Sequence, residues 1–318
     1  MTQPMTVTLA ALTFKRPQDL AALLPALAEQ ASDQSGDYEV GVLIVDNDPD
    51  AGARDAVERF AASTPVRVRY SHEAVPNIAA ARNRALDLAD TRLLVFLDDD
   101  ERPSASWLSH LLREFERSRP AAVVGPVVSA FDVEPDSWIT AGGFFQRRRL
   151  PTGTRIDVAA TNNLLLDLDV VRELGLHFDP AFGLTGGEDM LFTRQLRSAG
   201  REMVWCDEAL VTDVVPAGRT TRRWVTLRAL SNGNSWGLTS VALTATPPAR
   251  LVVRARLVGQ GAIRVVGGSA RAAAGYVSHR AGDHARGVRT LMRGLGMLGG
   301  AVGWRYEEYR RPTPASAS

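Results

Sequence analysis

The sequence predicts an α/β fold with a mainly parallel sheet, helices on both faces and a helical C-terminal appendage. Two observations support it. Short apolar runs of strand length alternate with segments of helical period through most of the chain. Several of the runs also end in acidic residues, most clearly residues 93–97, which lead directly into Asp98, Asp99 and Asp100. In open α/β sheets, ligands bind outside the carboxyl ends of the strands, so these acids also indicate a site.

The first half of the chain alternates regularly. Pro17 suits the first turn of a helix, where no backbone N–H is needed, and Asn77 is a good N-cap. The expected strands are residues 7–13, 40–45, 66–70 and 93–97, and the expected helices begin near Pro17, Ala51 and Asn77.

The second half is less regular. The glycine- and arginine-rich residues 142–153 indicate a crossing loop or hairpin, and Thr246-Pro247-Pro248 is the clearest boundary. The other expected elements are a helix from Trp107 to Phe115, a strand at 122–127, a strand at 164–166, a glycine-rich loop at 182–187, a helix at 190–199, a strand at 204–206 and a basic helix at 219–230.

The composition excludes several classes of protein. Cys206 is the only cysteine among 318 residues, so no internal disulfide can form and a cytoplasmic location is expected. No signal-peptide pattern and no run of 18 apolar residues is found. Lys15 is the only lysine, which excludes a P-loop GKS/GKT motif. The five histidines show no metal-ligand spacing, so zinc is not expected.

The charge is distributed unevenly. Residues 250–311 hold twelve arginines against Asp283, Glu307 and Glu308, a balance of +9, so the net charge of +1 leaves −8 for the rest. We expect three parts: residues 1–245 as the α/β domain, residues 249–311 as a basic amphipathic helical region, and residues 312–318 as a disordered tail. The basic region predicts peripheral docking on an anionic membrane surface. The alternative is packing on the first domain or on a second copy of the chain, as a homo-oligomer.

Two acidic clusters carry the predicted chemistry. Three adjacent carboxylates repel one another unless a cation or solvent separates them, so the triplet indicates Mg²⁺ or Mn²⁺, with a solvated acidic turn as the alternative. Glu188 and Asp189 follow the glycine-rich loop, where the alternative is an ordinary helix start. A metal that neutralises leaving phosphates and a carboxylate that accepts a proton together suit group transfer from an activated phosphate ester.

Seven ordered motifs between residues 7 and 237 carry a resemblance to a known family. They are LTFKRP, IVDND, PNIAAARNRAL, FLDDDE, the TNN strand entry, FGLTGGED and RTTRRW. The chain thereby resembles family 2 glycosyltransferases, in particular the succinoglycan-type glucosyltransferase subgroup. The resemblance implies the GT-A fold, a nucleotide-diphosphate sugar donor and inversion at the anomeric carbon by a single displacement.

The resemblance also implies roles for individual residues. Asp100 would bind the metal with the diphosphate, Asp189 would be the catalytic base, and Glu188 beside it would contact the donor or acceptor sugar. The nucleotide-sugar-binding residues would be Thr13, Arg16, Asp46, Asn77, Arg82, Asp98 and Asp99. Arg223 and Trp224 match the end of a Gln-x-x-Arg-Trp motif and would lie on the acceptor or diphosphate side. Thr220 replaces the glutamine, so we expect addition of one sugar rather than polymerisation.

The expected acceptor is a glycan or a lipid-linked glycan, at the inner face of a membrane. The alternatives are a metal-dependent nucleotidyltransferase and a catalytically idle GT-A scaffold in a glycan-assembly complex. Nucleic acid is not an expected partner, because the basic region has no recognisable binding motif. The segment Gly233-Asn234-Ser235-Trp236-Gly237 matches the nucleophile elbow of serine hydrolases, but it lacks the buried strand that this motif requires.

Overall fold

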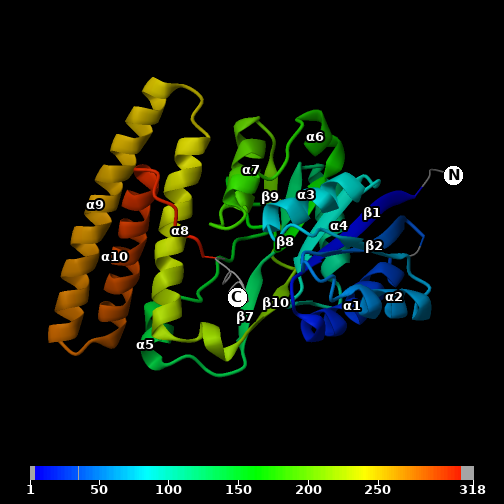
Figure 1. Cartoon of the computed structure of the whole chain (residues 1–318), viewed down its shortest axis with the longest axis horizontal. Coiled ribbons are helices and arrows are strands. Elements are labelled where there is room, and N and C mark those ends of the chain that lie inside the picture. Colours follow the sequence, from blue (N-terminus) through cyan, green and yellow to red (C-terminus); the bar gives the residue numbers. More distant parts are fainter. Residues whose placement is uncertain (1–3, 35, 309–318) are drawn as a thin grey trace, which may run out of the picture. The chain divides into compact units, whose positions relative to one another are not determined.

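The computed structural model describes residues 4–34 and 36–308 (Figure 1). The chain forms two compact units. The first comprises the described parts of Met1–Asp132, Gln146–Pro180 and Asp189–Pro216, and the second comprises those of Val133–Phe145, Ala181–Glu188 and Ala217–Ser318. The tail predicted at residues 312–318 lies outside the described residues.

A seven-stranded sheet forms the centre of the first unit, in the order β3-β2-β1-β4-β8-β6-β9. Its strands are β1 (Met5–Thr13), β2 (Tyr38–Asp46), β3 (Val68–His72), β4 (Leu93–Asp98), β6 (Ala122–Val124), β8 (Asn163–Asp167) and β9 (Met203–Trp205). All neighbouring strands pair in parallel except that β8 is antiparallel to β4 and β6. The predicted mainly parallel sheet is therefore confirmed.

Helices cover both faces of this sheet, as the alternation of strand and helix patterns predicts. They are α1 (Pro17–Ser32), α2 (Arg54–Ser63), α3 (Ile78–Leu88), α4 (Trp107–Ser118), α6 (Leu168–Glu173) and α7 (Glu188–Ser198). Successive strand residues point to opposite faces. In β4, Leu93 and Val95 enter the core under α1, α2 and α4, whereas Leu94 and Phe96 enter the core under α3, α6 and α7. This explains why β4 is apolar from Leu93 to Leu97 on both of its faces.

A second, three-stranded sheet of the first unit corrects part of the prediction. It has the order β5-β10-β7, with β5 at Glu101–Pro103, β7 at Val127–Phe131 and β10 at Val211–Val215. The single strand predicted at 122–127 is wrong, because the chain leaves the large sheet at Gly125-Pro126 and continues as β7. A Cβ added at Gly125 would lie 2.2 Å from the Ala209 carbonyl oxygen, and proline lacks a ladder N–H. No strand was expected at β10.

Helices dominate the second unit. They are α5 (Ser137–Gly142), α8 (Arg222–Ala242), α9 (Pro247–Val277) and α10 (Ala281–Ala301), and α10 packs against α5, α8 and α9 (Figure 1). The helical character expected for residues 249–311 is confirmed over α9 and α10. The helix predicted at 219–230 continues to Ala242, and α5 was not anticipated.

Glycines allow these helices to approach closely. A Cβ added at Gly268 of α9 would lie 2.4 Å from the Leu291 backbone nitrogen of α10, and one at Gly296 of α10 would lie 2.0 Å from the Leu230 carbonyl oxygen of α8. Real Cβ atoms do not come this close, so backbone packs on backbone here. Among the described helices, none combines the length and the low polarity needed to cross a bilayer.

Candidate active site

Side chains at the carboxyl ends of β1 and β4 form one hydrogen-bonded cluster. Thr13, the last residue of β1, donates its hydroxyl proton to Asp99 Oδ2 over 2.8 Å. Arg16, just before α1, lies between two acids, with Nη1 2.9 Å from Asp99 Oδ1 and 2.7 Å from Asp100 Oδ2. Because β1 and β4 are parallel neighbours, their ends meet at one edge of the sheet. Thr13, Arg16, Asp99 and Asp100 are thus brought together, as the sequence indicated.

Burial gives the cluster unusual electrostatics. Asp99 and Asp100 are 4% and 8% exposed. Desolvation raises the pKa of Asp99, although Arg16 and Thr13 oppose the shift. Desolvation also raises the pKa of Asp98 to about 6, with the Arg82 guanidinium opposing it. These carboxylates therefore need a cation nearby, and the chain itself provides Arg16 beside Asp99 and Asp100 and Arg82 near Asp98.

Glu101 is a further site residue that sequence reasoning did not single out. Its Oε2 accepts a hydrogen bond from the Asp98 backbone nitrogen at 3.0 Å, and its Oε1 accepts one from Asn162 Nδ2 at 2.7 Å. The side chain is only 1% exposed, and desolvation together with Asp98 raises its pKa well above the ordinary value. Two sequence signals pointed to Glu101: its position directly after the triplet, and the TNN motif, which contains Asn162. Only the fold brings Glu101 and Asn162 together.

Asp46 and Asn77 organise the loops beside the cluster. Both oxygens of Asp46 accept hydrogen bonds, from the backbone nitrogens of Asp48 and Ala53 and from the Tyr70 hydroxyl, at 2.9 to 3.0 Å. Asn77 caps α3 as predicted, because its Oδ1 accepts from the second and third backbone nitrogens beyond it. Its Nδ2 also donates to the Pro180 carbonyl oxygen at 3.0 Å.

Arg82 lies on α3 and is 5% exposed. Its guanidinium lies over the Phe178 ring, 5.7 Å from the centroid, and its charge acts on Asp98. A buried arginine that faces a carboxylate at the end of a strand is well suited to an anionic ligand. The predicted donor-side residues therefore surround one edge of the sheet.

The second acidic cluster begins α7. Asp189 is half-buried, and its Oδ1 accepts a hydrogen bond from the Met190 backbone nitrogen at 2.6 Å. Within the described residues, its carboxylate makes no hydrogen bond or ion pair with the triplet. Asp189 belongs to the first unit, whereas Glu188, which is 4% exposed, belongs to the second. The structure therefore leaves Asp189 available for another group.

The loop before these acids is held on α8 within the second unit. Gly186 and Gly187 have φ values of +74° and +96°, in the region that favours glycine. The Ser235 hydroxyl donates to the Gly186 carbonyl oxygen at 3.3 Å, and a Cβ added at Gly187 would lie 2.9 Å from Ser235 Cβ. This gives Ser235 a packing role on a helix, so the nucleophile-elbow interpretation fails on local structure.

Arg223 and Trp224 lie in the first turn of α8. Thr221 caps the helix, since its hydroxyl oxygen accepts from the Trp224 backbone nitrogen at 3.2 Å. The Trp224 ring is nearly parallel to Phe145, at 4° and with centroids 6.1 Å apart. Arg223 is exposed and has no ion pair in the part of the chain that the structure describes, so its charge is available to a ligand.

A metal ion would have few ligands from the protein alone. Among the described residues, no group of three or more His, Cys, Asp or Glu side chains is arranged to hold one. Asp100 is placed to bind a cation, because its Oδ2 already lies 2.7 Å from Nη1 of the Arg16 guanidinium. Mg²⁺ sites commonly use one or two carboxylates and take their remaining ligands from phosphates and water. The triplet fits that pattern.

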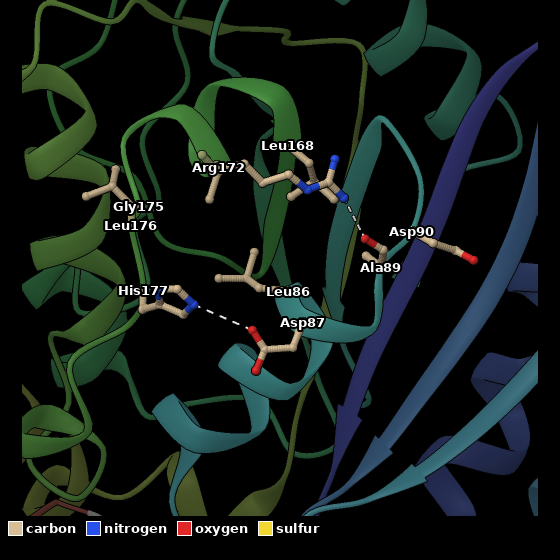
Figure 2. A pocket seen from close by; sticks show the side chains of 10 residues that line it. Leu86, Asp87, Ala89, Asp90, Leu168, Arg172, Gly175, Leu176 and His177 are labelled. Atoms are coloured by element: carbon tan, nitrogen blue, oxygen red, sulfur yellow. Dashed lines mark hydrogen bonds and ion pairs between the residues drawn. The ribbon is translucent and has the colours of Figure 1, made fainter.

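A cavity of about 460 Å³ lies elsewhere in the first unit (Figure 2). Its wall includes Ala89 and Asp90, which precede β4, whereas the triplet follows β4. Arg172 Nη2 donates to the Ala89 carbonyl oxygen at 2.7 Å, and His177 Nε2 lies 3.5 Å from Asp87 Oδ1. These polar groups already pair with one another. The cavity lies at the opposite end of β4 and does not belong to the acidic site.

A mainly parallel sheet with acids and arginines at the carboxyl ends of its strands defines an α/β protein whose ligand site is expected at those ends. Residues 10–175 match the model of glycosyl transferase family 2. The chain is also 33% identical over 225 residues to the succinoglycan biosynthesis protein ExoM of Rhizobium meliloti (strain 1021), covering 71% of this chain and 72% of the relative. The chain therefore belongs to glycosyl transferase family 2.

A further relative agrees with this assignment, and solved structures share the fold. Glycosyltransferase AglE of Haloferax volcanii is 23% identical over 197 residues, which cover 62% of this chain and 63% of the relative. The crystal structure of S. aureus TarS 1-349 in complex with UDP has a TM-score of 0.52 at 13% identity, covering 91% of this chain and 90% of that one. The structure of GalNAc-T7 with UDP, GalNAc and Mn²⁺ has a TM-score of 0.53 at 13% identity, covering 76% and 52%. The GT-A fold and the assignment as a glycosyltransferase are thus confirmed.

Proposed function

We propose that this glycosyltransferase moves a sugar from a nucleotide-diphosphate sugar to a hydroxyl group of a glycan or lipid-linked glycan, with inversion. The observation that carries the proposal is the joining of Thr13, Arg16, Asp99 and Asp100 at the edge of the sheet. This edge combines hydrogen-bonding groups, a cation and carboxylates, as a sugar nucleotide requires. Structures of the same fold contain UDP or UDP-GlcNAc, which supports a nucleotide-sugar donor.

On the donor side, Asp46 and Asn77 hold the loops that would frame the base and ribose, and Arg82 would face the diphosphate. Asp98 would accept hydrogen bonds from the ribose or sugar hydroxyls. Asp100 would hold Mg²⁺ or Mn²⁺, which supplies charge neutralisation of the departing diphosphate when bound. Arg16 would contact the same phosphates, because its guanidinium already faces both acids.

On the acceptor side, Asp189 would accept the proton of the attacking hydroxyl. Its half-buried carboxylate at the start of α7 has no competing side-chain partner among the described residues. Glu188 would contact a sugar beside it. Arg223 and Trp224 would bind the acceptor or the diphosphate, with the exposed guanidinium as the ligand-binding group.

We further propose residues 1–245 as the transferase domain and residues 249–311 as a peripheral attachment region. The acceptor would then be carried at the inner face of a membrane, and the enzyme would act from the cytoplasm.

Thermal shift with UDP and UDP-sugars, with and without Mg²⁺ or Mn²⁺, tests the donor site. Metal-dependent stabilisation is expected for the wild type and for Asp90→Asn, a matched control at the opposite end of β4. Asp100→Asn should lose the metal-dependent part. If EDTA leaves both stabilisation and transfer unchanged, the metal assignment is wrong. Stabilisation by nucleoside triphosphates with release of pyrophosphate would instead indicate a nucleotidyltransferase.

A further inference from the structure

The loop of residues 181–187 leads directly to the Glu188-Asp189 pair. It closes on itself, because the Gly186 backbone nitrogen donates to the Phe182 carbonyl oxygen at 2.9 Å. The hydroxyl of Ser235 on α8 holds the end of the loop. Glycine loses more conformational freedom on ordering than any other residue, so contacts from outside this glycine-rich loop are needed to keep it in one arrangement.

Arg305 supplies such a contact at the start of the loop. Its Nη1 donates to the Ala181 carbonyl oxygen over 2.7 Å. The same guanidinium lies over the Phe182 ring, 5.6 Å from the ring centroid, in a cation–π contact. Phe182 is only 3% exposed, whereas Arg305 is exposed. One surface side chain thus bonds the backbone of the loop and lies against its buried aromatic ring.

This arginine belongs to the segment after α10, residues 302–308, here called the strap. The end of α10 is a Schellman motif, in which the Trp304 backbone nitrogen donates to the Gly299 carbonyl oxygen at 2.9 Å. Gly303 has a φ of +89°, in the region that favours glycine. A Cβ added at Gly299 would lie 2.4 Å from Trp304 Cε3, so the indole lies against the end of the helix. The strap therefore leaves α10 in a defined direction.

Helix α8 fixes the strap through Asn234, which is 1% exposed. Its Nδ2 donates to the Trp304 carbonyl oxygen at 2.8 Å, and its Oδ1 accepts from the Tyr306 backbone nitrogen at 2.9 Å. These two bonds hold the backbone on both sides of the arginine. Glu308 accepts hydrogen bonds from two further side chains of α8, those of Arg228 and Ser231.

We propose that Arg305 is a positioning residue, which holds the loop of residues 181–187 so that Asp189 can accept the proton of the attacking hydroxyl. The inference rests on the proposed role of Asp189 as the base. Asn234 and Ser235 are adjacent on α8, where the first holds the strap and the second holds the end of the loop. Helix, strap and loop thus form a closed circuit of contacts, in which Arg305 joins the strap to the loop. Displacing a reacting group by about 1 Å can lower a rate by roughly 10²-fold, so this link acts on turnover.

Hydrogen exchange of the full chain without ligand tests whether Arg305 holds the loop. In Arg305→Met the amides of residues 181–187 should exchange roughly tenfold faster, the effect of losing one hydrogen bond from a charged group. Thermal unfolding should stay near that of the wild type, because the side chain is exposed. Arg305→Lys keeps a cation that can donate to the same carbonyl oxygen and should retain most of the protection.

Arg256→Met is the matched control for this experiment. Arg256 is exposed on α9 and makes no hydrogen bond or ion pair within the part of the chain that the structure describes. Its substitution should leave exchange in the loop unchanged. Exchange in Arg305→Met that equals that of this control overturns the proposal.

The rate of UDP release tests whether the contact acts through Asp189. With UDP-glucose or UDP-GlcNAc, Mg²⁺ and water as the acceptor, Arg305→Met should lower kcat by roughly 10- to 100-fold. Its affinity for UDP should stay that of the wild type, because Arg305 contacts the loop of the base and not the donor side. In an Asp189→Asn background the same substitution should have almost no further effect, since both changes then remove one shared contribution.

The outcomes separate this inference from the proposed function. Normal turnover in Asp189→Asn refutes the base, and the positioning role falls with it. Low turnover in Asp189→Asn with normal turnover in Arg305→Met refutes the positioning role alone. An equal loss from Arg305→Met in both backgrounds also refutes it, because the arginine would then act on another group. If neither sugar is hydrolysed, the exchange measurement decides the inference, since it needs no ligand.

Discussion

The carboxylate of Asp46 holds the loop between β2 and α2 and offers a test of how the donor site is built. It is fully buried, and it accepts hydrogen bonds from the backbone nitrogens of Asp48 and Ala53 and from the Tyr70 hydroxyl. Asp46→Asn replaces one acceptor oxygen by an NH₂ group at almost constant volume. In either orientation of the amide, one of the two backbone N–H groups then faces another donor.

The expected loss follows from these contacts. A hydrogen bond to a charged group contributes roughly 1.5–3 kcal/mol, and a buried N–H without a partner costs a further 1–3 kcal/mol or so. We therefore expect Asp46→Asn to lower the free energy of unfolding by about 3 kcal/mol. In a unit of this size the melting temperature should fall by roughly 6–12 °C. Donor affinity should fall as well, because Asn47 lies in this loop and its Oδ1 accepts a hydrogen bond from the Asn77 backbone nitrogen at 2.9 Å, so both residues would move.

Circular dichroism during thermal unfolding and titration with UDP measure the two effects. Asp50→Asn is the control, since it lies in the same loop with a side chain that is 81% exposed, and it should change little. If Asp46→Asn melts within about 2 °C of the wild type and yet loses nucleotide binding, the loop explanation is refuted. Asp46 would then contact the nucleotide directly.

Three further predictions concern other parts of the chain. Asp189→Asn should lower turnover by roughly 10²–10⁴-fold in a transfer assay while leaving donor affinity unchanged, and loss of affinity with normal turnover would contradict its role as a base. Gly268→Ala should destabilise the second unit, because the new Cβ would lie 2.4 Å from the Leu291 backbone nitrogen. Gly259→Ala has nothing within 4 Å of its new Cβ and should stabilise α9 by up to about 1 kcal/mol. Denaturant titration followed by the circular dichroism of the helices distinguishes the two variants. Burial raises the pKa of Cys206 to about 12, so its thiol should resist iodoacetamide at pH 8 until the protein is unfolded, and rapid labelling of the native protein would show that the core around β9 opens.

Local patterns accounted for much of the first unit. Short, mostly apolar runs predicted β1, β2 and β4 to within two residues at each end, because a strand buried on both faces is largely apolar. Asn77 and Pro17 marked the starts of α3 and α1 for equally local reasons, a cap and a fixed φ. The break between β6 and β7 at Gly125-Pro126 was not predicted. Gly125 is needed there because the Ala209 carbonyl, more than 80 residues further along the chain, packs against it.

What the sequence determined by itself was the kind of chemistry and its approximate place: acids at the end of a buried strand, in motifs that resemble family 2 glycosyltransferases. The tertiary structure decided which groups meet. Arg16 reaches Asp99 and Asp100 only because β1 and β4 are adjacent, and Asn162 reaches Glu101 only because β8 inserts antiparallel beside β4. The rotation of α9, which exposes one apolar face, depends likewise on glycines packed against α10. Periodicity and capping act over a few residues, whereas these contacts join residues that are distant in sequence, and only the folded chain brings them within hydrogen-bonding or packing distance.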